Sequence, residues 1–284
     1  MALVPWPAGR PAPPLPSRSP SLLRAIAIQP RLFREPLRAI GRRGRDGTRG
    51  NGDGRPVIVL PGMGVGDLAT LPLRRYLRAR GHDTRGWGLG RHRPDVAATL
   101  ERLLPRLEAL AAEHGRTVAL IGWSLGGVVA RELARLRPDL VASVITLGAP
   151  VRGGLRPTAI AGLFRLQGWD LAEVERLFSA AARVPIRVPL TAVWSRRDGI
   201  VAWQACVDTE TPGAENLEAT SCHWGLGFDP DVLEALAARL ATNRCESVTV
   251  TDLQRARIGD SYRIPLRNSV TVTGIAPASP AGIR

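Results

Sequence analysis

The chain has 284 residues, a formal net charge of +14 and 44% hydrophobic residues, which is enough apolar material for one large α/β core. The charge is uneven, because residues 1–55 hold eleven arginines against three acidic residues and residues 243–284 hold six against three. The basicity therefore belongs mostly to the two extensions and not to a nucleic-acid-reading face of the core, and no nucleic-acid partner is expected.

Residues 1–54 form a Pro- and Arg-rich N-terminal extension. Residues 1–20 are too poor in large apolar groups to fold alone, and we expect them to be disordered. Residues 21–40 alternate apolar side chains with arginines in short helical pieces. Two interpretations stay open for this segment: peripheral contact with an anionic membrane surface, and, the favoured one, a helix packed on the domain.

No stretch approaches the roughly 18 apolar residues that a membrane-spanning helix needs, and the N-terminus lacks the order of regions in a signal peptide. A cytoplasmic protein is expected, with association at a membrane surface as the alternative. Cys206, Cys222 and Cys245 do not have the spacing of a disulfide framework or a metal site. Cys206 and Cys222 could pair if the fold brings them together, but free thiols are the expected state.

Apolar runs and helical periodicities alternate from Arg55 to residue 242. Strands are expected at 57–60, 84–87, 118–121, 141–147, 189–195 and 216–220, and helices at 68–80, 95–114, 128–136 and 230–241. This alternation predicts an α/β domain with a mostly parallel central sheet flanked by helices.

The rhythm of strands and helices breaks after Gly148-Ala149-Pro150. Residues 151–188 show helical and irregular patterns without a strand, and we expect them to form a small helical cap over the carboxyl ends of the strands. Residues 243–284 have β-like alternation but follow a domain that is already complete, so this C-terminal tail receives no role.

A serine stands between a predicted strand and a predicted helix, in Gly122-Trp123-Ser124-Leu125-Gly126-Gly127. A G-x-S-x-G sequence in this context is typical of a nucleophile at a sharp turn, where the glycines leave room for the neighbouring strand and helix. In open α/β sheets the reactive groups gather at the carboxyl ends of the strands. Ser124 is therefore the candidate nucleophile.

A serine nucleophile needs a base and a carboxylate that orients the base. His223 directly follows the last predicted strand, whereas His82, His92 and His114 stand at positions typical of structural or solvated histidines. Asp198 follows the strand at 189–195 and is the expected orienting acid, with Asp208 as its nearest competitor.

Two backbone amides are expected to hold the oxyanion: Leu125, directly after the serine, and Met63, in the loop Pro61-Gly62-Met63-Gly64 after the first strand. The same loop does not match a phosphate-binding pattern, because no G-x-x-x-x-G-K-[ST] sequence is present.

These four motifs, in this order along residues 55–242, resemble the α/β-hydrolase family, with the bacterial lipase- and esterase-like serine hydrolases as the nearest group. The resemblance implies an α/β-hydrolase fold, a Ser–His–Asp mechanism on an acyl bond, no cofactor and no metal. The chain departs from the family in having Pro61-Gly62 where His-Gly is frequent.

The expected function is hydrolysis of a carboxylic ester, with a small-molecule or lipid ester as substrate. Trp123, Trp224 and Phe164 stand next to the catalytic positions or in the cap, and are expected to line an apolar acyl pocket. Two alternatives stay open: an acyltransferase that uses the same acyl-enzyme, and a non-catalytic binding protein on the same fold. The sequence does not indicate an oligomeric state.

Overall fold

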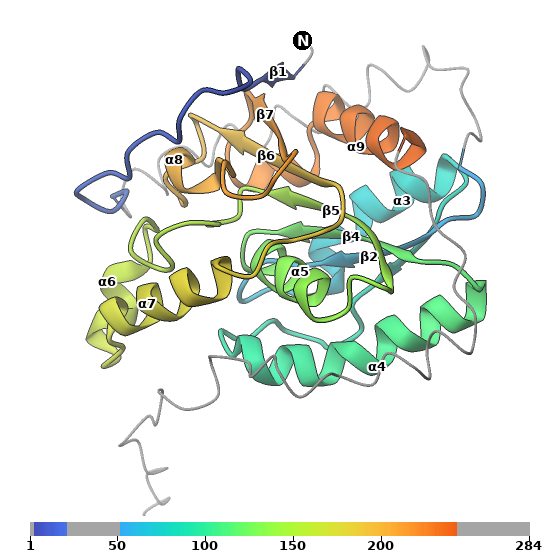
Figure 1. Ribbon diagram of the computed structural model, residues 1–284, viewed down its shortest axis with the longest axis horizontal. Coiled ribbons are helices and arrows are strands. Elements are labelled where there is room, and N and C mark those ends of the chain that lie inside the picture. Colours follow the sequence, from blue (N-terminus) through green and yellow to red (C-terminus); the bar gives the residue numbers. More distant parts are fainter. Residues whose placement is uncertain (1–2, 22–51, 243–284) are drawn as a thin grey trace, which may run out of the picture.

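A computed structural model describes residues 3–21 and 52–242 of the chain (Figure 1). Its centre is a seven-stranded sheet in the order β1-β7-β6-β5-β4-β2-β3. All neighbouring strands are parallel except β1, which pairs antiparallel with β7. The strands are β1 (Val4–Pro5), β2 (Pro56–Leu60), β3 (Asp83–Gly86), β4 (Val118–Trp123), β5 (Val141–Leu147), β6 (Leu190–Ser195) and β7 (Glu215–Ala219). The mostly parallel sheet predicted from the alternation of elements is confirmed.

Helices cover both faces of this sheet (Figure 1). Four helices make the two layers: α3 (Leu71–Ala79), α4 (Val96–His114), α5 (Leu125–Leu136) and α9 (Pro230–Thr242). Three more follow β5 and β6: α6 (Ala161–Leu166), α7 (Leu171–Ala182) and α8 (Trp203–Cys206). Side chains alternate along each strand, so Ile58 and Leu60 pack toward α4 and α5 while Val57 and Val59 pack toward α3 and α9. Continuous apolar strands are therefore needed, because both faces are buried.

Helix boundaries follow local chemistry. The side chain of Asp95 accepts the Ala98 amide at 2.9 Å and caps α4, and Gly115 ends that helix in the left-handed conformation. The predicted helix at 68–80 is shorter in the structure, because a 3-10 turn over Asp67–Thr70 precedes α3. Thus Leu68 lies in the 3-10 turn, where its side chain is exposed.

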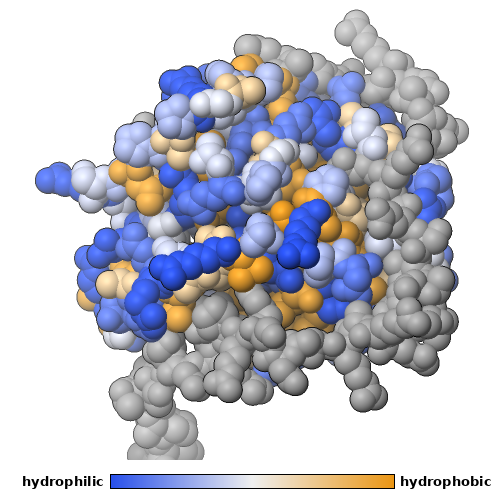
Figure 2. Space-filling view, in the orientation of Figure 1, coloured by the Kyte–Doolittle hydropathy of each residue, from blue (hydrophilic) through white to orange (hydrophobic). Residues whose placement is uncertain are grey.

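The segment between β5 and β6 carries α6 and α7, which lie together beyond the carboxyl ends of the strands (Figure 1). Its interior is a small apolar cluster of Ala161, Phe164 and Leu171. Hydrophilic side chains cover much of the cap on the face drawn in Figure 2, with smaller hydrophobic areas between them. Leu163 and Leu166 of α6 are among the exposed apolar side chains.

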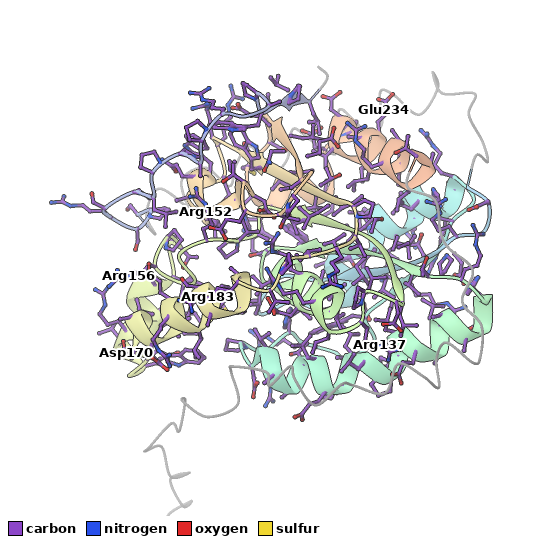
Figure 3. The ribbon with its side chains drawn as sticks, in the orientation of Figure 1. Arg137, Arg152, Arg156, Asp170, Arg183 and Glu234 are labelled. Atoms are coloured by element: carbon purple, nitrogen blue, oxygen red, sulfur yellow. The ribbon has the colours of Figure 1, made fainter. Side chains whose placement is uncertain are left out.

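The N-terminal segment differs from the expectation of disorder, because residues 3–21 have defined contacts along the sheet edge and the base of the cap. β1 adds a strand to β7, and the Trp6 ring lies 5.8 Å from that of Trp194 and 6.1 Å from that of Trp203. Further along, the guanidinium of Arg152 donates to the Pro13 carbonyl at 2.9 Å. Figure 3 shows Arg152 on the segment that leads into the cap. A proline-rich stretch cannot bury apolar surface alone, but here the rest of the domain supplies the surface.

Several predictions lie outside the described residues, among them the tail at 243–284 and all but the first residue of the amphipathic segment at 21–40. The division of the chain after residues 54 and 242 stays a prediction. In residues 3–21 and 52–242, no helix is long and apolar enough to cross a membrane. Cys206 and Cys222 are both buried and do not form a disulfide with each other.

Candidate active site

Ser124 occupies a sharp turn between β4 and α5. Its φ of 54° and ψ of −122° make it the only non-glycine residue with positive φ in the described part of the chain. Such a conformation is costly for a residue with a Cβ, and it persists only where the surroundings enforce it. The turn ends β4 and begins α5 within one residue, so the serine side chain stands at the carboxyl edge of the sheet and lines a pocket there.

The glycines beside Ser124 are required by close packing. A Cβ on Gly122 would meet the Gly126 carbonyl, and a Cβ on Gly126 would meet the Leu60 carbonyl, each closer than 3.0 Å. Gly127 is equally tight against Ala149. The elbow is therefore held between β2 and the end of β5, and the pattern G-x-S-x-G-G is the sequence that fits this space.

The structure brings Asp198 and His223 together, although 25 residues separate them. Asp198 Oδ2 lies 2.7 Å from His223 Nδ1, and both side chains are buried. The other carboxylate oxygen, Oδ1, accepts the amides of Ile200 at 2.9 Å and Val201 at 2.6 Å. Because the carboxylate accepts, Nδ1 carries the proton, and Nε2 is left as the basic nitrogen of the ring.

Gly148, at the end of β5, is a residue whose role the sequence analysis missed. Its φ is +54°, and an added Cβ would lie 2.8 Å from Asp198 Oδ2 and 3.0 Å from His223 Nδ1. The backbone at this strand end is thus packed directly against the acid–base pair. The signal available in the sequence was a glycine directly after a predicted strand, in Gly148-Ala149-Pro150.

Asp208, the competing acid, is engaged elsewhere. It forms a buried ion pair with Arg131 of α5 and accepts the Thr211 amide at 2.9 Å. Burial alone raises the pKa of Asp208, but the charge and hydrogen bond of Arg131 outweigh it and hold this pKa below the ordinary value. The pair links α5 to the loop after α8, which is a structural position.

The other histidines lie away from Asp198. His114, at the end of α4, pairs with Asp83 at 2.9 Å. His82 and His92 are buried, and desolvation lowers the pKa of each. Both are thus held neutral inside the protein, and neither is solvated.

A pocket of about 670 Å³ opens between the elbow, the start of α4 and the cap. Ser124 and the two expected oxyanion residues, Met63 and Leu125, line it. Most of its remaining wall is apolar, and includes Val128, Leu155, Ile160, Trp169, Val174, Leu177, Phe178 and Ile200. Charged side chains, Arg93, Asp95 and Glu101, stand along the stretch that begins α4.

None of the three aromatic residues expected to line the pocket is among the residues that form its wall. Trp123 is buried beside α3 and α9, and its indole N–H donates to the His223 carbonyl at 3.2 Å. Trp224 packs against Trp123 at 5.5 Å between ring centroids. Phe164 is buried in the cap, 4.9 Å from the ring of Trp169, which does line the pocket. Trp123 and Trp224 thus pack beside His223, and Phe164 packs behind Trp169 in the cap.

The loop after β2 comes close to the serine. A Cβ on Gly62 would lie 3.4 Å from the Ser124 Cβ, which is ordinary contact. Leu125 is the first residue of α5, and the first amides of a helix have no partner within it. The amides of Met63 and Leu125 thus belong to two backbone segments that meet at Ser124, which is the arrangement that an oxyanion site needs.

Only one group of potential metal ligands is close-set in the described residues: Asp83, Glu113 and His114. Arg85 donates to both carboxylates, at 2.7 Å to Asp83 and 2.5 Å to Glu113, so a guanidinium already supplies the positive charge. The group lies at β3 and the end of α4, away from Ser124.

A parallel sheet with a strained serine elbow after β4, and an acid and a histidine after β6 and β7, defines an α/β-hydrolase fold. Residues 57–264 match the family model described as the alpha/beta hydrolase family. The chain belongs to this family, as the sequence resemblance implied.

Solved structures agree on the fold. Aspergillus fumigatus lipase B is 19% identical, with a TM-score of 0.56 over 74% of this chain and 58% of that chain. A structure reported for LipS and LipT, two metagenome-derived lipolytic enzymes, is 15% identical, with a TM-score of 0.52 over 66% of this chain and 94% of that one.

Curated relatives match over shorter stretches. The pimeloyl-[acyl-carrier protein] methyl ester esterase of Sodalis glossinidius is 34% identical over 129 residues, which is 42% of this chain and 48% of that protein. The triacylglycerol lipase of Vibrio cholerae is 46% identical over 66 residues, covering 23% of this chain and 20% of that one. The match thus spans less than half the length of each of these relatives.

Proposed function

We propose that the protein is a serine hydrolase that cleaves carboxylic esters through an acyl-enzyme on Ser124. The observation that carries this proposal is a strained serine in the wall of a mostly apolar pocket, on the same sheet edge as a buried Asp198–His223 pair bonded at 2.7 Å. A backbone conformation of this cost is typical of functional positions.

In the proposed reaction, His223 Nε2 takes the proton of the Ser124 hydroxyl as its oxygen attacks the ester carbonyl. Asp198 keeps the other ring nitrogen protonated and stabilises the imidazolium that forms. The amides of Met63 and Leu125 donate to the oxyanion of the tetrahedral intermediate. His223 then passes the proton to the leaving alcohol, and a water activated by the same nitrogen releases the acid from the acyl-enzyme.

The pocket favours an apolar acyl group. Its volume of about 670 Å³ lies in the usual range for sites of small molecules, and its wall is mostly aliphatic and aromatic. The names of the relatives, a methyl ester esterase and triacylglycerol lipases, are those of enzymes acting on carboxylic esters. We therefore expect esters of medium-length fatty acids to be better substrates than acetate esters.

Labelling with a fluorophosphonate tests the nucleophile. The wild-type protein should be labelled at Ser124, as located by peptide mass spectrometry, and should hydrolyse p-nitrophenyl esters with chains of two to sixteen carbons. Ser124→Ala should abolish both, while Ser179→Ala, at an exposed serine of α7, should change neither. The proposal is refuted if the wild-type protein is folded and yet is not labelled. If the protein reacts with the probe at Ser124 and, in a separate assay without the probe, transfers the acyl group of an ester to added alcohols in preference to water, it is an acyltransferase.

A further inference from the structure

The loop Pro61–Val65, which carries the Met63 amide, is bonded to a second segment, Trp87–His92, which follows β3. The two segments lie side by side at the carboxyl edge of the sheet, because β2 and β3 are parallel neighbours. The Gly64 amide donates to the His92 carbonyl at 2.9 Å, and the His92 amide donates to the Val65 carbonyl at 2.9 Å. Two backbone hydrogen bonds thus tie His92 to this loop.

The ring of His92 adds a third hydrogen bond to the same loop. Its Nδ1 lies 2.7 Å from the Pro61 carbonyl oxygen, and the residue is only 1% exposed. A carbonyl can only accept, so Nδ1 carries the proton. Desolvation lowers the pKa of His92, which keeps the ring neutral and Nε2 unprotonated at neutral pH.

Neighbouring residues fix the position of this ring. The ring centroid of Trp87 lies 4.3 Å from that of His92, and the Trp87 indole N–H donates to the Gly90 carbonyl at 3.0 Å. The side chain of Arg91 reaches the same loop and donates to the Gly64 carbonyl at 2.7 Å. The side chain of Asp67, just after the loop, accepts the Trp87 amide at 2.9 Å.

A purely apolar role does not explain a histidine here. Nε2 of His92 is buried and has no partner in residues 3–21 and 52–242. A buried nitrogen without a hydrogen bond is unfavourable, and an apolar side chain of similar shape would avoid that cost. What the imidazole supplies, and an apolar side chain cannot, is the donor to the Pro61 carbonyl.

The geometry points to His92 as a positioning residue that holds the Pro61–Gly62 peptide so that the Met63 amide faces the oxyanion. The inference rests on the proposed hydrolase function. The loop needs such a support, because Gly62 and Gly64 leave the backbone on both sides of Met63 freer than other residues would, and Gly62 lies against the Ser124 Cβ. A donor displaced from a pre-organised site loses much of its effect on the transition state.

Two substitutions separate the donor from the packing. His92→Leu removes the donor and keeps an apolar side chain, whereas His92→Asn can place an amide N–H at the position of Nδ1. We expect His92→Leu to lower kcat by about ten- to a hundred-fold, short of the full loss on removing an oxyanion donor, which is about a hundred- to a thousand-fold. KM should change by less than about two-fold. His92→Asn should recover most of this loss. The value of kcat is calculated per serine labelled by fluorophosphonate, so that misfolded protein is excluded from the enzyme concentration.

Three further measurements make the test specific. The affinity for an aryl trifluoromethyl ketone, which forms an oxyanion on the serine, should fall with kcat in His92→Leu. His82→Leu, at another buried histidine, should lower the melting temperature alone. Arg91 is exposed and donates to the Gly64 carbonyl of the same loop, so Arg91→Met should lower kcat by about two- to five-fold. This variant tests the support of the loop if His92→Leu does not fold.

Hydrogen exchange of the peptide that contains residues 61–65 does not depend on activity, and it should be faster in His92→Leu than in the wild type. Equal exchange, or an unchanged kcat per labelled site, overturns the inference. Equal losses of kcat in His92→Leu and His82→Leu overturn it as well. A wild-type protein without labelling or hydrolysis, but with faster exchange in His92→Leu, refutes the proposed function and leaves the loop-holding role of His92 in place.

Discussion

A single methyl group at Gly148 tests the geometry of the acid–base pair. The backbone there has a φ of +54°, and a Cβ would stand 2.8 Å from Asp198 Oδ2 and 3.0 Å from His223 Nδ1. Real Cβ atoms essentially never come closer than 3.0 Å to a heavy atom outside their own and the adjoining residues, so something must shift in Gly148→Ala. The added Cβ would also lie 2.9 Å from Leu226 Cδ1. Since Oδ1 of Asp198 is bonded to two amides, the shift falls on the end of β5, on the Leu226 side chain or on the bond between Asp198 and His223.

Gly148→Ala should affect both the folding free energy and kcat. An alanine with positive φ costs about 1–2 kcal/mol of folding free energy. A hydrogen bond to a charged group contributes about 1.5–3 kcal/mol. Every 1.4 kcal/mol or so corresponds to a factor of ten in rate, so a weakened Asp198–His223 bond should lower kcat by about ten- to a hundred-fold. Loss of the correct tautomer altogether would cost more, about 10⁴-fold.

Gly213→Ala is the matched control for this prediction. Gly213 has a φ of +71°, and no atom lies within 4 Å of its added Cβ, so this variant carries the backbone cost without the overlap. Chemical denaturation should show the backbone cost of about 1–2 kcal/mol in both variants, with a further loss of unfolding free energy in Gly148→Ala, where the added Cβ also overlaps its neighbours. Steady-state hydrolysis of p-nitrophenyl butyrate should show the loss of kcat in Gly148→Ala alone. Wild-type kcat in Gly148→Ala, or an equal loss in Gly213→Ala, refutes the reasoning.

Three other predictions concern the sheet edge, the buried ion pair and the pocket. Trp6→Ala removes a half-buried ring from the edge of the sheet and should lower the melting temperature by about 2–8 °C, with kcat changed less than about three-fold; a change confined to kcat would contradict this. Arg131→Met leaves Asp208 buried without its partner and should cost about 3–5 kcal/mol at neutral pH, measured by urea unfolding. Because the pKa of Asp208 is lowered in the folded state, the pair stabilises the wild type above the ordinary carboxyl pKa near 3.8 and loses this contribution as the pH falls below it. The difference between the two proteins should therefore shrink in acid, and a difference independent of pH would exclude an electrostatic cause. Val174→Phe narrows the pocket and should lower kcat/KM for dodecanoate esters at least ten-fold while butyrate esters change little; equal losses on both would show that the acyl chain does not reach this wall.

The elements of the core could be predicted closely, because buried parallel strands read as short apolar runs and amphipathic helices show a 3.6-residue period. The strand predicted at 141–147 is β5 with the same bounds. β1 could not be predicted. Val4–Pro5 has no apolar run of its own, and it forms a strand only because β7 offers an open edge.

The three aromatic residues expected in the pocket show that a residue next to a catalytic position in the sequence need not line the pocket. Trp123 directly precedes Ser124, but side chains alternate along a strand, and it shares the face of Ala119 and Ile121, which packs toward α3 and α9. This alternation was readable from the sequence. Many of the residues that line the pocket come from the cap and the start of α4, and no local pattern links those two segments to Ser124.

The sequence by itself determined the alternation of the core strands β2 to β7 with the four helices α3, α4, α5 and α9, the serine elbow, and the positions of Asp198 and His223 after two strands. These follow from local patterns of apolar, glycine and turn residues. Tertiary structure alone decided that Asp198 bonds His223 while Asp208 bonds Arg131, that Gly148 packs on the acid–base pair, and that His92 reaches the loop after β2. Each is a contact between segments far apart in the chain, and such contacts depend on how the strands are ordered in the sheet, which local patterns do not encode.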